Sequence, residues 1–196
     1  MAPDRQQALD ADAQLLRAAA GGDREAVVAL VDGNGPRVLA LARRMLRDEQ
    51  AAEDVVQEAF LRLWRIAPEW RAGQARVSTW LHRVALNLCY DRLRKKREIL
   101  TDEPVEQIDD TPDAEAELVR AQTAARVRAA VDALPERQRA AIELCHYQEL
   151  GGAEAAEILE VSVEALESLL ARGRRALRAA LAEDRPAPRT DSGGMP

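Results

Sequence analysis

The sequence predicts an all-α protein made of two small helical domains joined by a flexible acidic linker. Ala, Leu, Arg and Glu, which favour helices, dominate the 196 residues, and β-branched residues are scattered rather than clustered. Apolar residues recur at steps of three and four, as on the buried face of a helix. The segment 98–118 breaks this pattern with nine acids, two prolines and no basic residue, so we interpret it as the linker.

The first fifty residues contain a series of helix start and stop signals. A first helix is expected from 10 to 20, followed by a Gly-Gly stop. Asp23 is a good N-cap for a second helix that runs to Val31, where the sequence Asp-Gly-Asn-Gly is expected to break it. Pro36 sits where a first-turn proline is tolerated, so a third helix is predicted from there to Arg47.

Two longer amphipathic helices follow. In 49–65 the apolar residues share one side, and the other side presents Glu53, Asp54, Gln57, Glu58, Leu61 and Arg62. Ser78 is expected to cap a helix that runs to Glu98, with a core side of Leu81, Val84, Ala85 and Leu88. Its opposite face carries Arg83, Asn87, Asp91 and Arg94. We interpret Trp80 as a core residue and His82 as a partly exposed structural residue.

The C-terminal part predicts a helix-turn-helix. A helix from about 135 to 147 is followed by a short helix at 153–159 and a tight turn at Glu160–Val161. Ser162 is a suitable N-cap for a longer second helix. The buried stripe of that helix is expected to contain Val163, Leu166, Leu170, Leu177 and Leu181.

Charge is distributed unevenly along the chain. The formal net charge of −6 would argue against nucleic acid if it were spread evenly. Segment 71–97, however, holds eight basic residues and one acid, whereas 98–118 holds nine acids and no base. A basic segment of this kind can contact phosphates, or it can be a solubilising helix end that suits the helix dipole.

Several functional classes are excluded by what the chain lacks. Two separated cysteines and two histidines provide neither a disulfide framework nor a metal site, and no nucleophile and base converge. We therefore expect no cofactor, no metal and no enzymatic activity. No segment approaches the roughly 20 apolar residues of a membrane span, and the polar N-terminus is unlike a secretory signal. We expect a cytoplasmic protein that does not insert into membranes.

Three segments together resemble one protein family. Asp48–Arg65 is similar to region 2.2, and Ser78–Glu98 to regions 2.3 and 2.4, of the sigma-70 family of bacterial RNA polymerase sigma factors. Leu134–Arg178 is similar to region 4, and the short chain resembles the extracytoplasmic-function (ECF) group. The resemblance implies a four-helix region 2 domain, the linker, a helix-turn-helix region 4 domain and a disordered tail, over 10–98, 99–118, 119–182 and 183–196.

For region 2 the resemblance implies two binding surfaces. The polymerase surface would contain Asp54, Gln57, Glu58 and Leu61, whose polar groups can pair with basic side chains of a partner helix. The alternative is the solvated face of an ordinary amphipathic helix. The promoter minus-ten element would contact Trp70, Arg76, Arg83, Asn87, Arg94, Lys95 and Arg97. In this set Asn87 offers a donor and an acceptor to a base edge, and Trp70 is the candidate for base stacking.

For region 4 the resemblance implies binding of the minus-thirty-five element. Our candidates on the second helix of the helix-turn-helix are Ser168, Arg172, Arg174 and Arg175. Two features depart from the family. Glu164 and Glu167 stand where many members carry Lys or Arg, and Glu160 replaces a common turn glycine, at a cost of about 1 kcal/mol if its φ is positive.

The implied function is a promoter-specificity subunit. Such a protein binds core RNA polymerase and promoter DNA, and the resemblance implies that an anti-sigma factor controls it. The alternative is a sigma-like decoy that sequesters an anti-sigma factor without binding DNA, which the acidic Glu164 and Glu167 would favour. The basic segment 71–97 opposes the decoy.

Overall fold

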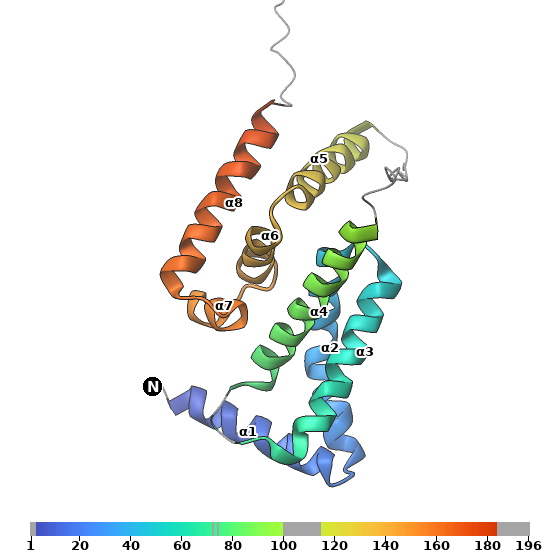
Figure 1. The fold of residues 1–196 in the computed structure, drawn as a ribbon, viewed down its shortest axis with the longest axis vertical. Helices are drawn as coiled ribbons and strands as arrows, with labels where there is room; N and C mark the ends of the chain where they lie inside the picture. The colour runs from blue at the N-terminus through green and yellow to red at the C-terminus, as the bar shows by residue number, and fades with distance from the viewer. Residues whose placement is uncertain (1–2, 72, 74, 100–114, 184–196) are drawn as a thin grey trace, which may run out of the picture.

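The structure is a computed structural model that describes residues 3–71, 73, 75–99 and 115–183. Every regular element in these ranges is helical, as predicted (Figure 1). The elements are α1 (Pro3–Ala20), α2 (Arg24–Leu46), α3 (Glu49–Ile66), η1 (Ala67–Glu69), α4 (Val77–Ile99), α5 (Glu115–Asp132), α6 (Glu136–Ile142), η3 (Glu143–Tyr147), α7 (Gly152–Leu159) and α8 (Val163–Glu183). No helix in the described ranges is long and apolar enough to cross a membrane.

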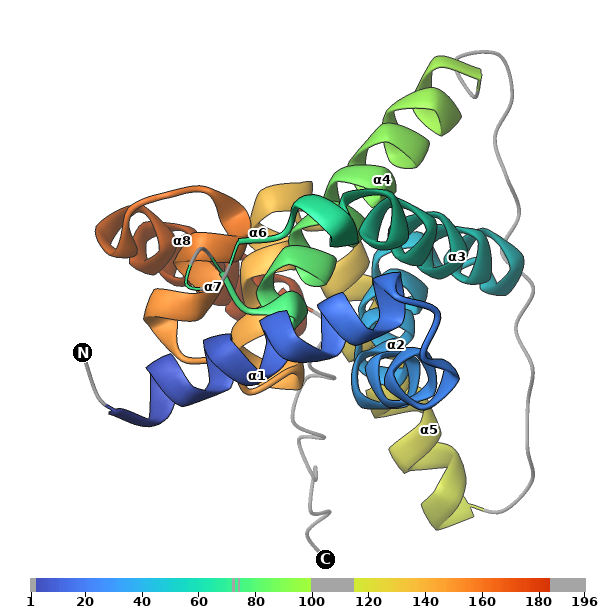
Figure 2. The same cartoon turned by 90° about the horizontal axis from the view of Figure 1, so that it is seen from below.

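The N-terminal helices form a bundle with α2 at its centre, in contact with α1, α3 and α4. Figure 2 shows α1 running across one end of this bundle. The fully buried side chains at its centre are mostly leucines and come from all four helices: Leu16, Leu30, Leu41, Met45, Leu63 and Leu81. The α3 stripe that was predicted from the sequence supplies buried Val55, Ala59 and Leu63.

The break predicted in the middle of α2 is wrong, because one helix continues through Pro36. Proline removes a backbone N–H and crowds the carbonyl of the preceding turn. Here the Asn34 side chain donates a hydrogen bond of 2.8 Å to the Leu30 carbonyl. Buried Leu30 and Val38 lie eight residues apart on the same side of the helix. Tertiary packing on both sides of the proline therefore outweighs its local preference.

The caps of the helices are partly as predicted. Asp23 does cap α2, since its Oδ1 accepts from the backbone N–H groups of Glu25 (2.9 Å) and Ala26 (3.3 Å). Ser78 does not cap α4, which already begins at Val77. The backbone N–H of Val77 donates to Asp12 Oδ2 at 2.8 Å, so α1 supplies the capping carboxylate from across the bundle.

The C-terminal helices form the predicted helix-turn-helix from α7 and α8. Glu160 takes a left-handed conformation (φ 54°) in the turn, and Ser162 Oγ accepts from the Ala165 N–H at 3.2 Å. Leu166 and Leu170 are buried as expected. Val163 is 41% exposed, so its assignment to the buried stripe is wrong, and the stripe begins one turn further into α8.

The predicted linker and tail lie largely outside the described residues. Helix α5 begins at Glu115, so the last four residues of the expected linker are helical. The remainder of that linker from residue 100, and the expected tail from residue 184, lie outside the described residues.

Candidate functional site

A groove between α3 and α4 brings together all four residues of the predicted polymerase surface. It has a volume of about 630 Å³, and we call it the α3–α4 groove. One wall carries Asp54, Gln57, Glu58, Leu61 and Arg62. The other carries Leu88, Asp91, Arg92 and Lys95. The wall on α3 forms because these residues follow one another at helical steps on the side opposite the buried stripe.

The polar side chains on the α3 wall of this groove are accessible to solvent or ionised. In the described part of the chain, neither Asp54 nor Gln57 makes a side-chain hydrogen bond, and both are exposed. Glu58 accepts a hydrogen bond from Arg62 Nε at 2.8 Å. This bond, with the charges of nearby arginines, lowers the pKa of Glu58, so the carboxylate is ionised at neutral pH. Leu61 is 44% exposed among these groups.

The predicted minus-ten residues of α4 divide into two groups with different surroundings. Arg94, Lys95 and Arg97 are exposed at the C-terminal end of the helix. Arg83 and Asn87 lie further back and face the helix-turn-helix half of the molecule. Arg83 Nη1 lies 3.6 Å from Glu160 Oε1, and Asn87 lines a hollow of about 510 Å³ between α4 and α6–α7. Arg83 is therefore partly covered by the turn before α8, whereas Asn87, Arg94, Lys95 and Arg97 are exposed.

The loop before α4 carries the other two predicted minus-ten residues. Arg76 is exposed. Trp70 is half-buried and packs edge-on against Trp80, with ring centroids 6.1 Å apart. Its buried Nε1 has no hydrogen-bond partner among the described atoms. The Trp70 ring therefore helps to hold this loop against α4.

His82 is buried rather than partly exposed, so that prediction is wrong. Only 1% of the residue is accessible, because α7 packs against α4. Its Nδ1 lies 2.7 Å from the Ser78 carbonyl, which accepts its proton, while Nε2 has no partner among the described atoms. Burial lowers the pKa of His82, so the ring is neutral at neutral pH.

Helix α8 presents the four predicted minus-thirty-five residues to solvent. Ser168, Arg172 and Arg175 are exposed and follow one another at steps of four and three, so they share one face. Arg174 is also exposed, but it points elsewhere, with its Nη2 3.3 Å from His146 Nε2. Exposed Glu164 and Glu167 occupy the first two turns of the helix.

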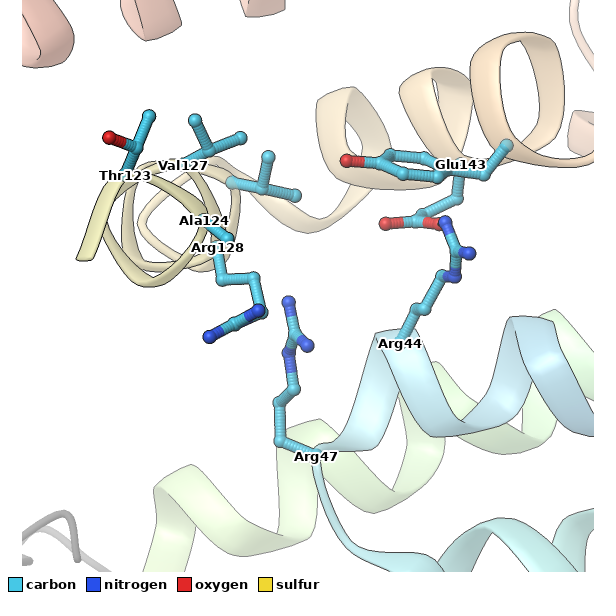
Figure 3. Close-up of a pocket in the computed structure, with 9 residues that line it drawn as sticks. Arg44, Arg47, Thr123, Ala124, Val127, Arg128 and Glu143 are labelled. Carbon is cyan, nitrogen blue, oxygen red and sulfur yellow. The ribbon is translucent and has the colours of Figure 1, made fainter. Parts of the chain in front are cut away.

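The sequence did not predict the contacts between the N-terminal helices and the C-terminal helices. Arg37 Nη2 donates to the Gln148 carbonyl at 2.7 Å, and Gln148 Nε2 donates back to the Arg37 carbonyl at 2.9 Å. Figure 3 shows Arg44 beside Glu143. Arg44 Nη1 lies 3.4 Å from Glu143 Oε2. Glu143 and Gln148 are polar and give no sign of their burial in the sequence, because their partners lie about a hundred residues away.

A helix-turn-helix whose second helix exposes arginines places the chain in the class of DNA-binding proteins. Comparison with known families defines it further: Sigma-70 region 2 matches residues 30–99, and Sigma-70, region 4 matches residues 124–177. The chain belongs to the ECF group of the sigma-70 family of RNA polymerase sigma factors. It is thus a promoter-specificity subunit that binds core RNA polymerase and promoter DNA, and not an enzyme.

Relatives and solved structures agree with this assignment. The ECF sigma factor SigM of Mycobacterium tuberculosis is 36% identical over 166 residues, covering 85% of this chain and 82% of SigM. SigW of Bacillus subtilis is 32% identical, covering 80% of this chain and 89% of SigW. The structure of CnrH in complex with the cytosolic domain of CnrY covers 89% of this chain with a TM-score of 0.65 and 27% identity, and 99% of CnrH. These relatives favour the promoter-specificity function over the decoy.

Proposed function

We propose that the α3–α4 groove is the surface that binds core RNA polymerase. The observation that carries this proposal is the pair of exposed, unpartnered side chains Asp54 and Gln57 beside exposed Leu61. Polar groups around an accessible apolar side chain are typical of protein interfaces. Glu58 is already paired with Arg62, so the free carboxylate that this wall offers to a basic partner helix is that of Asp54.

We propose that the exposed basic residues of α4 and α8 bind promoter DNA. We assign the minus-ten element to Trp70, Arg76, Arg83, Asn87, Arg94, Lys95 and Arg97, and the minus-thirty-five element to Ser168, Arg172, Arg174 and Arg175. Arginine and lysine supply phosphate contacts, and the amide of Asn87 can read a base edge. The two surfaces belong to the proposed domains 10–98 and 119–182, which the acidic segment 99–118 joins.

Control by an anti-sigma factor in the cytoplasm completes the proposed function. CnrH was solved bound to the cytosolic domain of a second protein. The sigma factor RpoE of Bartonella quintana, which shares this fold (TM-score 0.59, 23% identity), was solved with the anti-sigma factor NepR. Both support a regulator that binds this chain directly.

The test of the polymerase surface is a matched pair of double variants. Asp54→Ala/Gln57→Ala removes one carboxylate and one amide from the groove, whereas Glu53→Ala/Gln50→Ala removes the same two groups from exposed positions of α3 outside it. We expect the groove variant to bind core polymerase about tenfold more weakly, as loss of central interface residues does, and the control to bind normally. Equal affinities of the two variants in a fluorescence titration would exclude the groove.

A further inference from the structure

Another hollow lies between the C-terminal end of α2 and the helices α5 and η3 (Figure 3). Its volume of about 620 Å³ falls within the roughly 300–1,000 Å³ that is typical of small-molecule sites. We call it the α2–α5 pocket. None of the described residues that line it belongs to the polymerase or DNA surfaces assigned above. The pocket is therefore a candidate for a separate binding site.

Two arginines bring hydrogen-bond donors without partners into the α2–α5 pocket. Figure 3 shows Arg47 and Arg128 pointing into the same space from α2 and α5. Arg128 is exposed and makes no hydrogen bond or ion pair in the described part of the chain. Arg47 donates from Nε to Asp132 Oδ1 at 2.9 Å, which leaves the donors of both its Nη atoms for a ligand. Two guanidinium groups that face one space repel each other, and an anion between them would remove this repulsion.

The carboxylates near the pocket do not cancel this positive charge. Glu143 lines the pocket, but it is 2% exposed and lies 3.4 Å from Arg44. Burial raises the pKa of the Glu143 carboxyl, and the nearby charge of Arg44 opposes this shift. Asp132, the partner of Arg47, also lies 3.6 Å from Arg139. Three arginines thus line the pocket against one carboxylate, so the lining is positive whether or not Glu143 is ionised.

The other side chains of the pocket are mainly apolar. Val131 of α5 is 3% exposed, and Val127 one turn earlier is half-buried. Tyr147 of η3 is 46% exposed, with the guanidinium carbon of Arg44 3.9 Å from the centre of its ring. Small-molecule sites combine a mostly apolar lining with a few polar groups that fix the orientation of the ligand. The α2–α5 pocket has this composition, and its polar groups are cations.

We propose that the α2–α5 pocket binds a small organic phosphate, with the phosphate group between Arg47 and Arg128 and the apolar body against the valines of α5. A phosphate monoester carries up to about two negative charges at neutral pH, which match two guanidinium groups. The planar fork of arginine donates paired hydrogen bonds to phosphate oxygens. Because the walls come from both the N-terminal and the C-terminal helices, a bound phosphate also stabilises the contact between them.

The first test removes the guanidinium group that has no partner. Arg128→Gln deletes it without breaking a contact among the described residues, and Arg24→Gln makes the same change of charge at an exposed position at the other end of α2. The probe is hexyl phosphate, titrated into the full chain by isothermal calorimetry. We expect Arg128→Gln to bind it about tenfold more weakly than Arg24→Gln does. Equal affinities of the two variants, or no saturable binding to the unchanged chain below about 10 mM, would overturn the proposal.

A second set of probes separates the contributions of the phosphate group and the apolar body. Inorganic phosphate lacks the body, and hexanoate carries a carboxylate in place of the phosphate. Each should bind the unchanged chain at least about tenfold more weakly than hexyl phosphate. If either binds equally well, the site does not select an organic phosphate and the proposal is wrong.

Hexaglutamate tests an acidic protein segment as the alternative occupant of the pocket. If this peptide binds more tightly than hexyl phosphate and loses affinity in Arg128→Gln, the pocket takes an acidic partner protein and the proposal is overturned. We expect it to bind more weakly, because its carboxylates have no apolar body to place against Val127 and Val131. None of these titrations uses polymerase or DNA, so their outcome is independent of the proposed function.

Discussion

The close approach of α8 to α6 allows a test of how α8, the second helix of the helix-turn-helix, packs against α6. Gly173 is buried on α8, and a Cβ added there would lie 2.8 Å from Ile142 Cδ1. Carbon atoms in contact normally lie about 3.5–4.0 Å apart. The next nearest atoms, Gln138 Cβ and Ile142 Cγ1, would be 3.6 Å away, which is ordinary contact. A single methyl group of Ile142 therefore decides whether alanine fits.

The expected magnitudes follow from this one contact. Gly173→Ala gains about 1 kcal/mol of helix stability and loses about 1–3 kcal/mol to overpacking, so the free energy of unfolding should fall or stay level. Ile142→Val removes Cδ1 and by itself costs about 1 kcal/mol. In the Ile142→Val background, Gly173→Ala should instead stabilise the protein by about 1 kcal/mol. The two substitutions are thus coupled by at least about 1 kcal/mol.

Urea unfolding followed by circular dichroism measures this cycle. Gly33→Ala is the matched control, because Gly33 is also inside a helix and nothing lies within 4 Å of its added Cβ. It should stabilise by about 1 kcal/mol in both backgrounds. If Gly173→Ala behaves like Gly33→Ala in the presence of Ile142, then α8 does not approach α6 as described. The positions of Arg172 and Arg175 relative to α6 would then be wrong as well.

Three further predictions concern α8, His82 and the cysteines. Arg172→Ala should weaken binding to minus-thirty-five duplex DNA and reduce the slope of log affinity against log salt by about one; an unchanged slope would remove it from the phosphate contacts. Burial lowers the pKa of His82 below its ordinary 6.5, so the unfolded chain takes up a proton that the folded chain excludes. The free energy of unfolding should therefore fall as pH drops below 6.5, and His82→Gln should flatten that fall in urea titrations at different pH. Burial raises the pKa of Cys89 to about 12, so a disulfide reagent should modify Cys145 well before Cys89 in the native protein and both at once in urea.

Local signals in the sequence predicted most of the helices. The caps at Asp23 and Ser162 and the stripe of α3 depend on residues a few positions apart, so they can be recognised without tertiary structure. The continuity of α2 through Pro36 could not, because it depends on burial of both halves of the helix against α3 and α4. The start of α5 at Glu115 was hidden by the acidic composition of the segment before it.

The candidate site also has a part that could be predicted from sequence and a part that could not. The residues of the α3–α4 groove on α3 share one helical face, which a period of 3.6 residues predicts directly. The surroundings of Arg83 and the burial of His82 depend on α7 and the turn after it, which lie some seventy residues further along the chain. A helix face that is polar in sequence looks solvent-exposed, whereas here another domain supplies its partners.

Glu160 combines a strained backbone conformation with a side-chain contact to another helix. Its φ of 54° costs a non-glycine residue about 1 kcal/mol in the turn between α7 and α8. Glycine would relieve this strain, and it would also remove the carboxylate that lies 3.6 Å from Arg83. Helix-turn-helix geometry alone therefore does not explain a glutamate here. The ion pair with Arg83 is an interaction that a glycine at this turn could not make.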